Sequence, residues 1–192
     1  MNYITLYNMA KQKNSSQLEN LKKILENKYI DSSNILVEKN KTSKGVEFKM
    51  ERKIISHNDI KYLIFRYDPD KVDIFPYFNQ ISGLKKICDY FMFVEEGQNF
   101  YAILIELKLG IDSAKKQLEA SDEFIKFLIK SSERVGLPNL TNFNIIKVRL
   151  SEERSKKRNR TTKQKKLQMD ENRIINYDHS DVFRIMEVLD VI

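Results

Sequence analysis

Apolar residues recur along the chain with two different periods, and these predict helices in some segments and strands in others. Leucines three and four residues apart predict an amphipathic helix over residues 15–29. Alternation over 46–51, a turn signal at 57–59 and an apolar run at 62–65 together predict a β-hairpin. Shorter strands are expected at 34–37, 143–150 and 173–177.

Two runs, 87–94 and 100–109, are apolar on both alternating faces. This pattern is typical of central strands that are covered on both sides. The sequence between them, at 96–99, has a tight-turn composition, so the two runs are predicted to pair antiparallel. A long helix should follow, capped by Asp112 or Ser113 and ending near Arg134.

An apolar segment from about Asp181 is predicted to form a final helix, whose apolar face must dock on the sheet or on a partner. The order of the elements predicts a fold of the α/β class (α+β mixed), with a central mixed β-sheet flanked by α-helices. We expect one domain over residues 1–192. Its parts would be an N-terminal helix and hairpin at 1–80, a core at 81–150, a basic loop at 151–172 and a C-terminal strand and helix at 173–192.

The net positive charge of the chain comes from one stretch, from Arg154 to Lys166. The 192 residues include 34 Lys and Arg against 27 Asp and Glu, a formal net charge of +7, and without the stretch 26 basic and 27 acidic residues remain. A local cationic segment is typical of contact with a polyanion such as nucleic acid, and a solvated loop is the alternative. The candidate contact residues are Arg154, Lys156, Lys157, Arg158, Arg160, Lys163, Lys165 and Lys166.

The composition excludes several classes of protein and site. One cysteine and two histidines leave no internal disulfide, no cysteine-based zinc finger and no three-histidine zinc site. Cys88 lies within an apolar run and is expected to be a small core residue rather than a nucleophile. Without a secretory signal pattern or a long apolar run, the chain is expected to be soluble and cytoplasmic, with no membrane contact.

Three charged residues interrupt the two central strands. Glu106 and Lys108 are two residues apart and so point to one face, and antiparallel pairing would bring Asp89 close to them. Burying an unpaired ion costs several kcal/mol, so such groups need compensation. A divalent cation such as Mg²⁺ can neutralise two carboxylates, and a nearby lysine can assist phosphodiester hydrolysis. A solvated pair at the strand ends is the alternative.

The spacing of these residues resembles a known family. Asp89, sixteen intervening residues and then Glu106-Leu107-Lys108, on apolar strands followed by a helix, are similar to the motif of the PD-(D/E)XK nuclease superfamily. The resemblance covers roughly residues 84–130 and implies a restriction-endonuclease-like core. It also implies that Asp89, Glu106 and the Leu107 backbone carbonyl bind the metal and that Lys108 acts in catalysis.

The same resemblance suggests two further site positions. Gln117 lies early in the following helix, where many members carry a glutamine that faces the site. An acidic residue on the first helix is frequent in the family, and Glu19 is preferred over Glu26 for that position. Cys88 stands where the family name has a proline, and no subfamily is identified. For Gln117, Glu19 and Glu26, ordinary surface positions are the alternative.

The function expected from these features is Mg²⁺- or Mn²⁺-dependent hydrolysis of DNA, with RNA as the alternative substrate. A restriction or anti-phage role follows only from the habits of the resembled family. The chain has little room for a recognition domain, so a homodimer or a partner subunit is expected to contribute specificity. Two rival hypotheses remain: a non-catalytic nucleic-acid-binding module, and an assembly subunit that docks through its C-terminal helix.

Overall fold

The computed structural model describes residues 16–41, 45, 47–67, 75–108, 113–136, 143–151, 167–177 and 181–192. Along the chain the elements are α2 (Gln17–Ile24), η1 (Asn27–Tyr29), β1 (Ile35–Lys41), β2 (Glu47–Ile55), β3 (Ile60–Arg66), β4 (Tyr90–Glu96), β5 (Asn99–Lys108), α3 (Lys115–Arg134), β6 (Phe143–Ser151), β7 (Ile174–Tyr177), β8 (Val182–Arg184) and α4 (Ile185–Leu189). The strands form two mixed sheets, and the chain has a mixed α/β fold.

The larger sheet has five strands in the order β3-β4-β5-β6-β7. Strand β4 pairs antiparallel with β3 on one side and β5 on the other, and β6 and β7 continue the sheet parallel to β5. The predicted antiparallel pairing of the two apolar runs is therefore confirmed. Gly97 in their connecting turn has a φ of 58°, a conformation that glycine adopts without steric cost.

The smaller sheet has the order β1-β2-β8, and it corrects the predicted hairpin at 46–65. Strand β2 pairs with β1 and β8, while β3 pairs with β4 in the larger sheet. The burial of the two segments explains the separation. Strand β2 buries only alternate residues, whereas Leu63, Ile64 and Phe65 of β3 are buried in succession and need cover on both faces.

The C-terminal segment also differs from the prediction, because the helix expected from Asp181 begins with a strand. Val182 and Phe183 pair with Lys53 and Ile54 of β2, and only the five residues of α4 are helical. Phe183 is fully buried between the sheets, a position that favours the extended chain. The apolar face of α4 packs into the core of this chain rather than remaining open for a partner.

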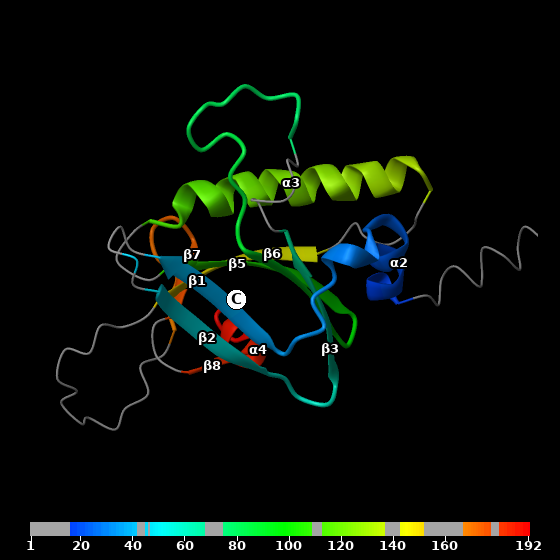
Figure 1. Cartoon of the computed structure of the whole chain (residues 1–192). Helices are drawn as coiled ribbons and strands as arrows, with labels where there is room; N and C mark the ends of the chain where they lie inside the picture. Colours follow the sequence, from blue (N-terminus) through cyan, green and yellow to red (C-terminus); the bar gives the residue numbers. More distant parts are fainter. Residues whose placement is uncertain are drawn as a thin grey trace, which may run out of the picture.

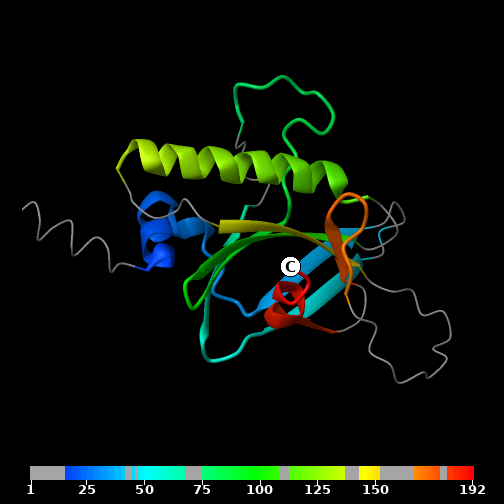
Figure 2. The same cartoon turned by 180° about the vertical axis from the view of Figure 1, so that it is seen from behind.

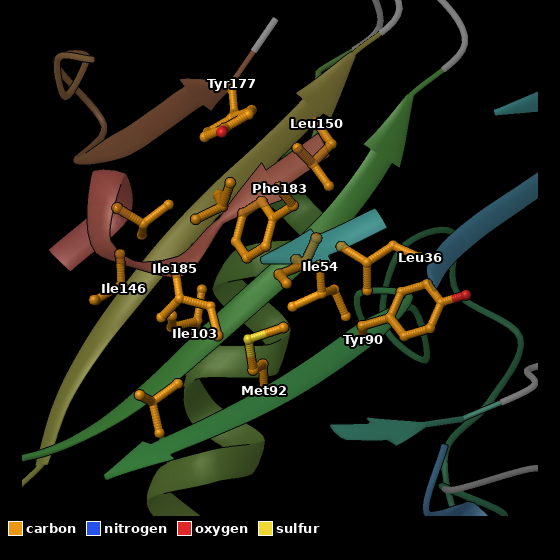
Figure 3. Close-up of a cluster of buried hydrophobic side chains, with 14 of the residues drawn as sticks. Leu36, Ile54, Tyr90, Met92, Ile103, Ile146, Leu150, Tyr177, Phe183 and Ile185 are labelled. Atoms are coloured by element: carbon orange, nitrogen blue, oxygen red, sulfur yellow. The ribbon is translucent and has the colours of Figure 1, made fainter. Parts of the chain in front are cut away.

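The layers of the fold are a helix, the large sheet and the small sheet. Helix α3 lies along one face of the large sheet, and β1, β2, β8 and α4 lie on the other side (Figures 1 and 2). The expectation of a sheet flanked by helices thus holds for one face only, because the small sheet and α4 together cover the other. Figure 3 shows the core between the sheets, where Phe183 and Ile54 face Met92 and Ile103.

The first helix is shorter than predicted and is capped from outside. It ends at Ile24, and Leu25 is extended. The Ser16 hydroxyl donates to Glu95 on β4 (2.8 Å), and the Leu18 backbone N–H donates to the same carboxylate (3.1 Å). An anion at a helix N-terminus satisfies free N–H groups and favours the helix dipole. None of the helices in the described part of the chain has the length and apolar character needed to span a membrane.

A pair of phenylalanine substitutions tests the two-sheet core. Phe183→Ala should lower the free energy of unfolding by about 3–5 kcal/mol, because it removes a fully buried ring between two sheets. Phe127→Ala is the matched control: that ring is 66% exposed on α3, so its loss should change stability by no more than about 0.5 kcal/mol. Urea denaturation followed by circular dichroism measures both. Equal effects would contradict this packing.

Candidate functional site

The two predicted carboxylates meet where β4 begins. Tyr90 of β4 pairs with Ile105 of β5, which makes Asp89 and Glu106 the next opposed residues along the two strands. The Leu107 backbone N–H donates to Asp89 Oδ2 at 2.7 Å. The Asp89 side chain thus provides an acceptor at the point where the ladder of β4 stops, and this bond fixes its carboxylate against β5.

Lys108 completes the cluster from the same strand. Its Nζ lies 2.6 Å from Glu106 Oε1, as expected for residues two apart on one face. Glu106 is only 4% exposed, and its second oxygen, Oε2, is buried without a hydrogen bond. A buried carboxylate oxygen that lacks a donor costs free energy, which makes it a candidate ligand for a cation.

The electrostatics of the pair follow from burial and from mutual repulsion. Burial, reinforced by the nearby Asp89 charge, raises the pKa of Glu106 to about 7, while Lys108 acts in the opposite direction. Burial also raises the pKa of Asp89, and the Leu107 N–H, Lys108 and Arg66 oppose that rise. Because burial raises the pKa of both carboxylates and the Asp89 charge raises that of Glu106 further, the pair needs a further positive charge to ionise together at neutral pH.

The donor set fits a hard divalent cation that keeps most of its ligands for water and substrate. The N–H and C=O of one strand residue point to the same side, so the Leu107 carbonyl faces the side on which Asp89 lies. Among the described residues, no group of three or more His, Cys, Asp or Glu side chains is arranged to hold a metal. Two carboxylates with a carbonyl match Mg²⁺, which binds proteins through one or two carboxylates.

Glu38 of β1 is a site residue that the sequence analysis missed. Burial raises the pKa of Glu38, Asp89 adds to this rise, and Lys108 and Arg66 oppose it, so the carboxylate lies within electrostatic reach of all three. Strand β1 is held there by the buried Tyr90 hydroxyl, which pairs with the backbone of Val37. The signal was the alternation of Leu36 and Glu38 beyond the predicted end of this strand at Val37.

Arg66, the last residue of β3, was also missed. It lies opposite Tyr90 in the register of the sheet, and its charge lowers the pKa of both Asp89 and Glu38. A single exposed arginine at the end of a strand carries no signal in the sequence, because only the pairing of β3 with β4 brings it near Asp89.

Gln117 lies in α3, one helical turn before the residue that holds the start of β4. The Cys88 backbone N–H donates to Ser121 Oγ (2.7 Å), and the Ser121 hydroxyl donates to the Gln117 carbonyl (2.8 Å). The Gln117 side chain is half-buried. Cys88 itself is 1% exposed, and burial raises the pKa of its thiol strongly, in agreement with its predicted place in the core.

The structure does not bring Glu19 to this site, which corrects its prediction as a metal ligand. Glu19 pairs with Lys22 on the exposed side of α2 (2.8 Å). The start of that helix is bonded to Glu95, which is separated from Asp89 by roughly 20 Å of strand. Glu26 pairs with Lys28 at the surface. Neither of these two carboxylates takes part, because β1 rather than α2 approaches the start of β4.

The basic tract from Arg154 to Lys166 lies outside the described residues. The chain leaves the described part just before the tract, at Ser151, which is in parallel register with Lys108. Ser151, the last described residue before the tract, is therefore the neighbour of Lys108 where β5 and β6 end.

Comparison of the chain with protein-family models, with curated proteins and with solved structures gave no match.

The raised pKa of Glu106 predicts how stability depends on pH. Without divalent cations, folded protein keeps this proton up to about pH 7, whereas the unfolded chain loses it near 4.5. The folded state therefore binds more protons in that window, and stability should fall as pH rises. Glutamine has no such proton to lose. The free energy of unfolding of Glu106→Gln, relative to that of the wild type, should therefore rise by about 2–3 kcal/mol from pH 4.5 to pH 8.

Urea denaturation in EDTA at both pH values measures this gain. Glu19→Gln is the control, because that carboxylate is exposed and paired at the surface and should show no such gain. A difference between Glu106→Gln and wild type that does not change with pH would contradict the assigned cause.

Proposed function

We propose that this protein is a divalent-metal-dependent nuclease that hydrolyses phosphodiester bonds. The observation that carries the proposal is the Glu106 carboxylate, which is 4% exposed, bonded to Lys108 through one oxygen and without a hydrogen bond at the other. With Asp89 opposite, the cluster provides two carboxylates and one ammonium in the order that resembles the PD-(D/E)XK superfamily. A sheet built without a ligand at this point would gain by replacing Glu106 with an apolar residue.

Each member of the cluster has a distinct task in this proposal. Asp89, Glu106 and the Leu107 carbonyl would hold Mg²⁺ or Mn²⁺, which supplies a Lewis acid and lowers the pKa of bound water. The Asp89 carboxylate is kept in place by the Leu107 N–H, so it needs little reorganisation. The Lys108 ammonium stands beside Glu106, where it can orient the attacking water and stabilise negative charge developing on the phosphoryl oxygens. Gln117 would tune the site from α3.

The substrate is proposed to be DNA, with RNA as the alternative. The tract from Arg154 to Lys166 would hold the backbone, since lysine and arginine contacts to phosphates position a nucleic acid without reading its sequence. Cleavage specificity would then come from a homodimer or from a partner chain in the cytoplasm. A restriction or anti-phage role rests on the superfamily resemblance alone.

Substitution of Lys108 tests the enzymatic proposal. With Mg²⁺ or Mn²⁺ and plasmid, linear duplex and single-stranded substrates, Lys108→Ala should lower the cleavage rate by roughly 100-fold or more, because the transition state loses the ammonium that stands beside Glu106. Asp89→Asn should do the same. Glu19→Gln is the matched carboxylate control and should cleave like wild type, because Glu19 lies on the exposed side of α2.

The proposal fails if the wild type cleaves none of these substrates with either metal. It also fails if Lys108→Ala cleaves as fast as the wild type. A protein that binds nucleic acid but never cleaves it would instead support the rival binding module.

Neutralising the basic tract tests its contact with the backbone. The triple variant Lys156→Gln, Lys157→Gln and Arg158→Gln should bind duplex DNA more weakly and reduce the slope of log K against log salt by up to about 3, one unit for each lost phosphate contact. The triple variant Lys22→Gln, Lys23→Gln and Lys28→Gln, on α2 and the turn that follows it, serves as the control of equal charge. Parallel salt dependences for wild type and tract variant would exclude the contact.

A further inference from the structure

Arg66 is held over an aromatic ring that the small sheet fixes. Its guanidinium carbon lies 5.3 Å from the centroid of the Tyr90 ring. The Tyr90 hydroxyl donates to the Val37 carbonyl (3.0 Å) and accepts from the Val37 N–H (2.9 Å). Figure 3 shows the Tyr90 oxygen directed away from the apolar cluster, beside Leu36 of β1. The ring is thus fixed by its backbone in β4 at one end and by its hydroxyl at the other. The Arg66 guanidinium stacked on it therefore loses less conformational freedom on binding a ligand than a free arginine side chain would.

Arg66 lies near Asp89 and Glu38 but is not paired with either of them. Arg66 lowers the pKa of Asp89 and of Glu38, so it lies within electrostatic reach of both. Within the described part of the chain, however, it makes no ion pair, whereas Lys108 is bonded directly to Glu106. Arg66 is also exposed, unlike Glu106. A solvent-facing guanidinium beside a candidate metal site therefore retains N–H groups for an outside acceptor.

We propose that Arg66 is the phosphate-binding residue of this site and that a divalent cation at Asp89 and Glu106 switches its binding on. The inference rests on the proposed function and names its substrate contact. A guanidinium presents a planar fork that matches two phosphate oxygens, which a point charge such as lysine does not. Arg66 would bind a backbone phosphate of the nucleic acid beside the metal.

The dependence on the cation follows from the charges around Arg66. Without a metal, the carboxylates of Asp89 and Glu38 repel a phosphate that approaches the guanidinium. A cation bound at Asp89 and Glu106 removes most of that repulsion, so phosphate and cation should each strengthen the binding of the other by the same factor. This mutual effect separates Arg66 from an arginine that only offsets the charge of its acidic neighbours.

The experiment measures binding without cleavage. Fluorescence anisotropy gives the Kd of a labelled single-stranded oligonucleotide and of its duplex in EDTA and in Ca²⁺, an oxygen-binding cation used here as the probe. Wild type should bind more tightly in Ca²⁺ than in EDTA. Arg66→Gln should bind about tenfold more weakly than wild type in Ca²⁺, the loss expected for charge-assisted hydrogen bonds to a phosphate. Its affinity should fall much less in EDTA.

Two further variants make the result specific. Arg66→Lys should recover only part of the affinity, because it restores the charge without the fork. Lys61→Ala removes an exposed cation from the other half of the same strand, opposite Glu95, and should leave the gain from Ca²⁺ unchanged. Thermal denaturation of each variant checks that the fold is retained.

The proposal is overturned if Arg66→Gln binds like wild type in Ca²⁺, or if the wild type gains nothing from Ca²⁺. These outcomes are independent of cleavage. A wild type that cleaves DNA while Arg66→Gln binds normally would leave the nuclease intact and remove the role of Arg66. A wild type that shows the cation effect but never cleaves would leave the phosphate site and remove the nuclease.

Discussion

A carboxylate buried in an apolar sheet is the constraint on which the rest of this structure depends. Glu106 lies in a strand where eight of the ten residues are buried, and an isolated ion there would cost several kcal/mol. Lys108 on the same strand offsets part of this cost, whereas the charge of Asp89 on β4, which the Leu107 N–H holds in place, adds to it. A shift of the β4–β5 register by one residue would leave the Glu106–Lys108 pair intact but would place Asp89 opposite a residue of the other face, so the two carboxylates would no longer meet.

The same register places Tyr90 at the junction between the two sheets. Its ring packs in the core between them, and its hydroxyl takes up both polar groups of one residue in the middle of β1. That contact brings Glu38 toward the carboxylate pair from the small sheet, while the pairing of β3 with β4 brings Arg66 from the other side. One aromatic side chain thus joins the packing of the core to the charge distribution of the site.

The cations of the chain occupy different positions relative to this site. Lys108 is paired and mostly buried, and Arg66 is exposed and stacked, while the eight basic residues from Arg154 to Lys166 follow Ser151 in the sequence and lie outside the described residues. A buried pair contributes to chemistry through its fixed geometry, and an exposed cation contributes mainly to attraction and is screened by salt. The net charge of +7 therefore says little by itself, because each cation acts through its own surroundings.

What the sequence determined by itself is local. The apolar runs on either side of the turn predicted the central hairpin, and the spacing of two between Glu106 and Lys108 predicted their shared face, because alternation in a strand depends only on neighbouring residues. Tertiary structure alone decided the partners of β2 and β3, the strand at Val182–Arg184 and the arrival of Glu38 and Arg66 at Asp89. Glu19 was predicted and Glu38 was missed because the choice depends on which distant strand covers the start of β4. That choice is set by burial between the two sheets, and this burial depends on residues that lie far apart in the chain.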